Sequence, residues 1–265
     1  MPERNFKVAL LPLNIINGEP DANIRLAFDM LRNVDPDTDL AILPEMFTTS
    51  FFADASKMSQ AVENTPDDLF VRLKELSDRL DMGICGSVAV IEDGKLYNRG
   101  FFVLPGKELV TYDKYHLFSA GGESRIMTGG NGISPVVDFR TWKLRMAICY
   151  DIRFPVWLRN KNLAYDALIV PANWPEAREF AWRTLLTARA IENQSYILGC
   201  NRTGEDVYGR YPMESSIVLD HWGKTISKAD DSGIIYAVLE ADRINHDRVR
   251  FRPWADADEF KLSSI

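Results

Sequence analysis

Short apolar runs alternate with amphipathic segments along the chain, and this pattern predicts strands interleaved with helices. Residues 6–13 (FKVALLPL) and 39–45 (DLAILPE) are apolar runs of strand length. Between them, apolar residues recur at helical spacing over residues 21–34, which predicts an amphipathic helix with Asp21 as its N-cap. Residues 66–80 predict another helix, because they open with a proline and two acidic residues.

The middle of the chain predicts antiparallel strands, and the rest alternates strands with helices. Residues 82–114 read as successive strands, with the Asp93–Gly94 pair as a hairpin turn. Residues 134–149 predict a second hairpin, and we expect a helix from about Phe154. The remaining predicted elements are strands at 165–174, 195–202, 215–229 and 233–240, a long helix at 175–194 and a short helix at 241–249.

This order of elements predicts an α/β protein. Strands and helices are interleaved, with hairpins as well as crossovers, which is typical of mixed sheets covered by helices in layers. The chain contains no Ser/Gly-rich linker, repeat or low-complexity segment. We therefore expect a single domain over residues 1–265, with residues 250–265 as a docked C-terminal tail.

Composition narrows the class of protein. The apolar fraction of 46% allows a large core, and the net charge of -7 comes from acidic and basic residues interspersed along the chain. No basic block favours nucleic acid or a membrane surface as a partner. The apolar run near the N-terminus is too short for a signal peptide or a membrane span. The 3 cysteines show no CxxC spacing, so we expect a soluble protein of the reducing cytoplasm.

Three groups of chemical interest follow apolar strands directly. Glu45 closes AILPE, Lys114 follows LVTYD, and Cys149 closes MAIC. Because the carboxyl ends of neighbouring strands line one crevice in open α/β sheets, these side chains could converge. Each also has an ordinary structural explanation, as a turn carboxylate, a solvated lysine and a small buried side chain. Cys85 and Cys200 are assigned to the core.

The chemistry of a convergent site would be nucleophilic. A neutral thiol is a poor nucleophile, so Cys149 needs a base, and Glu45 could take its proton. An ammonium group at Lys114 and the backbone N–H of Tyr150 would stabilise the oxyanion of a tetrahedral intermediate. The dispersed His and Cys residues form no cluster that predicts a metal site, and no cofactor is expected.

The motifs around these residues resemble the nitrilase superfamily of carbon–nitrogen hydrolases. AILPEMF surrounds Glu45, YDKYHLF surrounds Lys114 and MAICYDIRFP surrounds Cys149, in the order of the superfamily's Glu-Lys-Cys triad. The resemblance implies that Glu45 is the general base, Lys114 the oxyanion stabiliser and Cys149 the nucleophile that forms an acyl-thioester. Glu123 matches an auxiliary glutamate. The resemblance also implies a four-layer α-β-β-α sandwich fold and, as is usual in the superfamily, a homodimer.

A finer pattern is similar to the omega-amidases, which hydrolyse the terminal amide of 2-oxoglutaramate and 2-oxosuccinamate. The matching stretches are KYHLF, CYDIRFP, ANWP and ARAIENQSYILGCNRTG. The substrate would be a small-molecule amide with a carboxylate. Arg153 is the candidate partner of that carboxylate, or equally a salt bridge that locks the turn. Apolar walls would come from Phe118, Tyr150 and Trp174, the last of which could instead cap the core.

Three alternatives stay open. Cys149 could pair with His116 in a papain-like catalytic dyad, since His116 lies two residues after Lys114 in the sequence. Within the superfamily, a nitrilase, an aliphatic amide hydrolase or an N-carbamoyl amino acid hydrolase would share the triad. A non-catalytic scaffold would retain the fold while losing triad members, and none is missing here.

Overall fold

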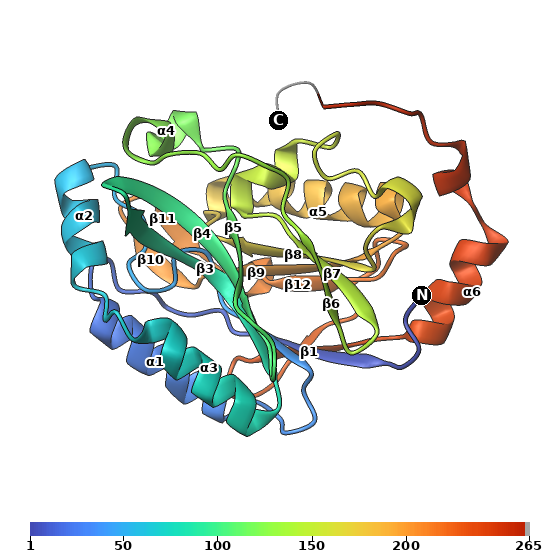
Figure 1. Ribbon diagram of the computed structural model, residues 1–265, viewed down its shortest axis with the longest axis horizontal. Helices are drawn as coiled ribbons and strands as arrows, with labels where there is room; N and C mark the ends of the chain where they lie inside the picture. Colours follow the sequence, from blue (N-terminus) through green and yellow to red (C-terminus); the bar gives the residue numbers. More distant parts are fainter. Residues whose placement is uncertain (263–265) are drawn as a thin grey trace.

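The computed structural model describes residues 1–262, which build two β-sheets packed face to face between helices (Figure 1). The first sheet has the strand order β13 (Lys228–Ala229), β14 (Ile235–Leu239), β1 (Phe6–Leu10), β2 (Leu40–Ile42), β3 (Gly83–Glu92), β4 (Lys95–Val103) and β5 (Val110–Asp113). The second has the order β12 (Ile217–Leu219), β9 (Tyr196–Asn201), β8 (Ala167–Ala172), β7 (Trp142–Met146) and β6 (Val136–Phe139).

Strand alternation divides the apolar side chains between two cores. Val8 and Leu10 of β1 point into the layer between the sheets, whereas Ala9 points to the outer face. That outer face is covered by α1 (Pro20–Arg32) and α3 (Leu69–Leu80). The second sheet is covered on its outer side by α5 (Glu179–Asn193), which lies opposite α1 and α3 in Figure 1. The predicted four-layer α-β-β-α sandwich is confirmed.

The remaining elements lie at the ends of the sandwich. They are α2 (Ala55–Glu63), α4 (Glu123–Ile126), α6 (Ala241–Arg250), the hairpin of β10 (Gly204–Asp206) and β11 (Gly209–Tyr211), and the 3-10 turns η1 (Ser119–Gly121), η2 (Cys149–Arg153), η3 (Lys161–Leu163), η4 (Glu176–Arg178), η5 (Met213–Ser215) and η6 (Pro253–Asp256). After α6 the chain contacts the body, since Lys161 Nζ donates to the Phe260 carbonyl at 3.1 Å. The last three residues of the tail predicted at 250–265, residues 263–265, lie outside the described residues. No helix within residues 1–262 is long and apolar enough to cross a membrane.

Several predicted boundaries need correction. The helix expected with Asp21 as N-cap begins at Pro20, after Glu19, and Asp21 lies in its first turn. Proline suits the first helical position because its missing N–H needs no partner there. The helix expected from Pro66 begins at Leu69. Helix α2 was not predicted; its N-cap Asp54 accepts a hydrogen bond from the Lys57 N–H at 3.0 Å.

The prediction of a helix from about Phe154 is wrong, because no helix begins there. The chain makes the 3-10 turn η2 instead and continues through irregular turns. Phe154 has φ -109° and ψ 87°, because the proline that follows disfavours the helical region at this position. The hairpin at Asp93–Gly94 is confirmed: both residues have positive φ, at 50° and 72°, as the tight turn between β3 and β4 requires.

Parallel pairing brings the polar strand ends to one edge. Strands β1, β2 and β3 are parallel neighbours in the first sheet, and β7, β8 and β9 are parallel neighbours in the second. Glu45 follows β2, and Cys149 follows β7, each by a few residues. Lys114 directly follows β5. The two sheets therefore deliver these groups to one end of the layer between them.

Candidate active site

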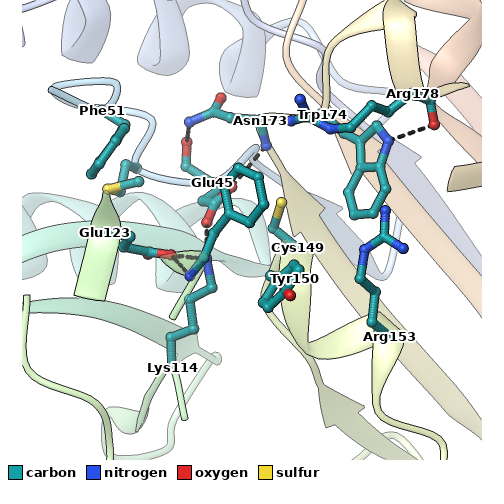
Figure 2. Close-up of a pocket in the computed structure, with 12 residues that line it drawn as sticks. Glu45, Phe51, Lys114, Glu123, Cys149, Tyr150, Arg153, Asn173, Trp174 and Arg178 are labelled. Atoms are coloured by element: carbon teal, nitrogen blue, oxygen red, sulfur yellow. Dashed lines mark hydrogen bonds and ion pairs between the residues drawn. The ribbon is translucent and has the colours of Figure 1, made fainter. Parts of the chain in front are cut away.

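Glu45, Lys114 and Glu123 form a buried cluster of charges (Figure 2). Lys114 Nζ lies 2.8 Å from Glu45 Oε1 and 2.8 Å from Glu123 Oε2. The three side chains are at most 4% exposed. An isolated charge is expensive to bury, and the two glutamate side chains that flank this ammonium group offset that cost.

Two asparagines complete the cluster, and sequence reasoning missed both. Asn98 Nδ2, on β4, donates to Glu45 Oε1 at 2.8 Å and to Glu123 Oε1 at 3.2 Å. The Asn173 N–H donates to Glu45 Oε2 at 2.8 Å. Asn173 follows strand β8 directly, so the strand-end criterion that selected Glu45 would have found it as well. Asn98 carries no such signal, because it lies inside a strand.

Cys149 is the first residue of η2, on the sharp turn that follows strand β7. Its φ of 45° is rare for a residue other than glycine and costs about 1–3 kcal/mol. The buried Asp151 carboxylate holds the turn: it accepts hydrogen bonds from the Ile148 N–H at 3.0 Å, the His116 N–H at 3.0 Å and the Tyr112 hydroxyl at 2.9 Å. The thiol is therefore presented by a backbone that the surrounding side chains fix in place.

Burial and charge set the protonation of the thiol. Burial and the negative charge of Glu45 raise the pKa of Cys149 well above its usual value, and Lys114 opposes this only in part. Burial lowers the pKa of Lys114, but Glu123, Glu45 and Cys149 outweigh it, so that pKa lies well above its ordinary value. At neutral pH the thiol of Cys149 therefore keeps its proton and the amine of Lys114 keeps its positive charge.

A cavity opens onto these groups. Tyr150, Phe118, Arg153 and Trp174 line it, as predicted residues of the pocket wall, and Arg178 lines it without having been predicted. The other lining residues are Glu45, Met46, Phe51, Lys114, Glu123, Cys149 and Asn173. Trp174 is 3% exposed and also packs on Trp182, with 5.3 Å between ring centroids, so it is both a pocket wall and a core residue.

Arg153 points along the pocket wall. Its Cζ lies 4.9 Å from the centroid of the Trp174 ring and 5.8 Å from that of Tyr150. No carboxylate of residues 1–262 lies within ion-pair distance of it, so the interpretation of Arg153 as a salt bridge that locks the turn is wrong. The guanidinium therefore faces the cavity beside the aromatic rings of Trp174 and Tyr150.

His116 supports the turn from behind. Its Nδ1 lies 2.9 Å from Asp151 Oδ1, and its ring stacks on Phe154 at 3.6 Å between centroids. It does not line the cavity. This placement disfavours the Cys149–His116 dyad, because the imidazole is engaged by Asp151 rather than by the thiol. Cys85 and Cys200 are buried free thiols, which confirms their assignment to the core.

Metal ligation finds no support in the described part of the chain. Among residues 1–262, no group of three or more His, Cys, Asp or Glu side chains is placed to hold a metal ion. The carboxyl groups that meet at the site, those of Glu45 and Glu123, are already bound by other side chains: Lys114 forms ion pairs with both, and Asn98 donates hydrogen bonds to both. What the arrangement offers is a thiol, a carboxylate and a fixed cation around one reaction centre.

Comparison with known proteins agrees with this geometry. Residues 7–248 match the carbon-nitrogen hydrolase family. The chain is 38% identical to the omega-amidase YafV of Yersinia enterocolitica, over 97% of this chain and 98% of that one. It is 29% identical to the 2-oxoglutaramate amidase of Bacillus subtilis, over 89% of this chain and 91% of that one.

A solved structure shares the whole fold. XC1258 of Xanthomonas campestris, a CN-hydrolase superfamily protein with an arsenic adduct in its active site, has a TM-score of 0.88 and 29% sequence identity. The match covers 98% of this chain and 100% of that one. The family match, the motifs and the fold lead to one conclusion: the chain is an enzyme of the carbon–nitrogen hydrolase family, within the nitrilase superfamily.

Proposed function

We propose that this enzyme is an omega-amidase, which hydrolyses the terminal amide of a small 2-oxo acid to the acid and ammonia. The observation that carries the proposal is the uneven charge of the cavity. Glu45, Lys114 and Glu123 lie on one side of the thiol, whereas Arg153 faces the cavity on the other side and has no carboxylate partner among residues 1–262 (Figure 2). A substrate with an amide at one end and a carboxylate at the other complements both. Similarity to the YafV and 2-oxoglutaramate amidases supports the same choice.

In the first half-reaction, Cys149 Sγ adds to the amide carbonyl carbon while Glu45 takes the thiol proton. The carbonyl oxygen becomes an oxyanion between Lys114 Nζ and the Tyr150 N–H. Because the pKa of Lys114 is raised, its charge is available throughout. Glu45 then gives its proton to the amide nitrogen, the C–N bond breaks, and ammonia leaves an acyl-thioester on Cys149.

In the second half-reaction, water adds to the thioester carbonyl. Glu45 removes a proton from the water and returns it to the departing sulfur, so that the acid is released and the thiol is restored. Glu123 positions Lys114 through its 2.8 Å ion pair and thereby holds the oxyanion donor in place. No cofactor enters either step.

Arg153 binds the substrate carboxylate in this proposal, and Phe118 and Trp174 flank the intervening chain. The molecule's net charge of -7 does not attract an anion at long range, so recognition depends on local cations. An arginine facing a pocket with aromatic neighbours suits this task, because its planar fork binds a carboxylate through two parallel hydrogen bonds.

Ammonia release from a panel of amides tests the proposal. The panel contains 2-oxoglutaramate, 2-oxosuccinamate, glutamine, asparagine, an N-carbamoyl amino acid and a simple nitrile. We expect the two oxo-acid amides to have the highest kcat/KM of the panel, and one at least about 100-fold above that of the simple nitrile, since a site built for a polar group rejects an analogue that lacks it. Preference for the carbamoyl compound or the nitrile would retain the family and reject the omega-amidase proposal.

We also propose a cytoplasmic homodimer. Free buried thiols suit a reducing compartment. On α5 and the β10–β11 hairpin, Phe180 is 86% exposed and Val207 is 87% exposed, which is unusual for large apolar side chains. Burial of such a surface against a second copy would remove it from water. Sedimentation at micromolar concentration checks the assembly, and a monomer would contradict it.

A further inference from the structure

A second arginine borders the cavity at the same end as Arg153. Arg178 ends η4, and its Cζ lies 5.2 Å from the Phe118 ring centroid and 6.0 Å from the Trp174 ring centroid. Both arginines therefore approach Trp174, and Figure 2 shows them with this ring on the far side of Cys149 from Lys114 and Glu123. Sequence reasoning did not select Arg178, because an arginine before a helix reads as an ordinary exposed residue.

The charges at this end of the cavity are not balanced. Within residues 1–262, neither Arg153 nor Arg178 lies within ion-pair distance of a carboxylate, whereas Arg183 and Arg189 on the following helix are paired with Glu179 and Glu192. Two guanidinium groups that share one aromatic neighbour repel each other. An anion between them would remove the repulsion and supply the missing hydrogen-bond acceptors.

The backbone fixes the base of Arg178. Its N–H donates to the Pro175 carbonyl at 2.9 Å, and its own carbonyl accepts a hydrogen bond from Trp174 Nε1 at 2.8 Å. The side chain is exposed at the cavity rim. A rigid base with a free guanidinium suits a residue that contacts a ligand as it enters, since little backbone order is lost on binding.

We propose that Arg178 determines specificity: together with Arg153 it holds the substrate carboxylate over Trp174, and so selects acidic amides over neutral amides of the same length. This inference rests on the proposed function for the choice of substrate. It adds a residue and a basis for selectivity that the Glu-Lys-Cys chemistry does not contain.

The test compares Arg178→Gln with the wild type on two substrates. One is 2-oxoglutaramate, and the other is 4-oxopentanamide, which has a methyl group in place of the carboxylate. Loss of a hydrogen bond to a charged group weakens binding by about 10- to 100-fold. We expect KM for 2-oxoglutaramate to rise by about that factor with kcat within about threefold, and kcat/KM for 4-oxopentanamide to stay the same. Arg178→Lys should recover part of the lost affinity.

Arg183→Gln is the matched control, because Arg183 is a nearby arginine that does not line the cavity. Its kinetics should equal those of the wild type. If Arg178→Gln leaves KM for 2-oxoglutaramate within about twofold, or raises KM for both substrates equally, the inference is overturned and the proposed function stands. If the wild type releases no ammonia from 2-oxoglutaramate, the proposed function itself is overturned.

Discussion

At the scale of single residues, the chemistry depends on two opposing charges that act on one thiol. Burial and Glu45 raise the pKa of Cys149, while Lys114 and the Asn173 N–H lower it. The raising influences win, so the resting thiol keeps its proton until a substrate arrives. Glu45 therefore has two roles in this account: it suppresses the free thiolate, and it accepts the proton when the sulfur attacks.

Because of these two roles, one substitution at Glu45 should slow amide hydrolysis and yet make the free thiol easier to deprotonate. Glu45→Gln should lower amide hydrolysis by about 10²- to 10⁴-fold, because the proton acceptor is lost. The same change removes a negative charge that raises the pKa of Cys149 and leaves Lys114 in place, so this pKa should fall. The pH midpoint of Cys149 alkylation by iodoacetamide should then move to lower pH. The midpoint is read from the mass of the Cys149 peptide.

The pH midpoint of Cys149 alkylation in Glu45→Gln is compared with that in the unsubstituted enzyme. An unchanged or higher midpoint in Glu45→Gln would contradict the electrostatic account of the thiol. Gln at position 45 retains the shape of the side chain, so a melting temperature near that of the parent shows that the fold is not the cause.

At the scale of elements, the nucleophile turn is held by side chains from outside it. Asp151 links the Ile148 N–H, the Tyr112 hydroxyl of β5 and His116, so one carboxylate joins the Cys149 turn to the strand that carries Lys114. This network also explains why a helix does not begin at Phe154. The proline that follows and the stack on His116 hold that residue in a non-helical conformation.

Tyr112→Phe tests this link without touching the cavity. Loss of the 2.9 Å hydrogen bond to buried Asp151 should lower the free energy of unfolding by about 1.5–3 kcal/mol. Because the link positions Lys114 relative to Cys149, kcat should fall while KM for 2-oxoglutaramate stays nearly constant. Denaturant unfolding and steady-state kinetics measure the two effects.

Tyr97→Phe on the adjacent strand β4 is the control, since its hydroxyl takes no part in the Asp151 network. It should leave kcat unchanged. A proportional loss of activity in both variants would show that the Asp151 network has no special part in positioning.

At the scale of the whole molecule, the site exists because two sheets deliver strand ends to one place. Glu45, Lys114 and Cys149 became candidates because each follows an apolar strand, and parallel pairing gives such positions a common edge. Their prediction as a triad came from the motifs around them, which resemble those of the nitrilase superfamily. Asn98 could not be predicted, because its direction depends on the register of β4 with β3 and β5, which is a non-local property. The same limit applies to Arg178, whose place at the cavity depends on how η4 folds back over Trp174.

The most direct test of the central claim is ammonia release from 2-oxoglutaramate by Cys149→Ala and Cys85→Ala, measured side by side. We expect Cys149→Ala to lose activity by about 10⁴-fold or more while it unfolds at nearly the parent temperature. Cys85 lies buried in the core away from the cavity, so Cys85→Ala should retain most of the activity. Equal loss from both variants, or full activity in Cys149→Ala, would contradict the account of Cys149 as the nucleophile.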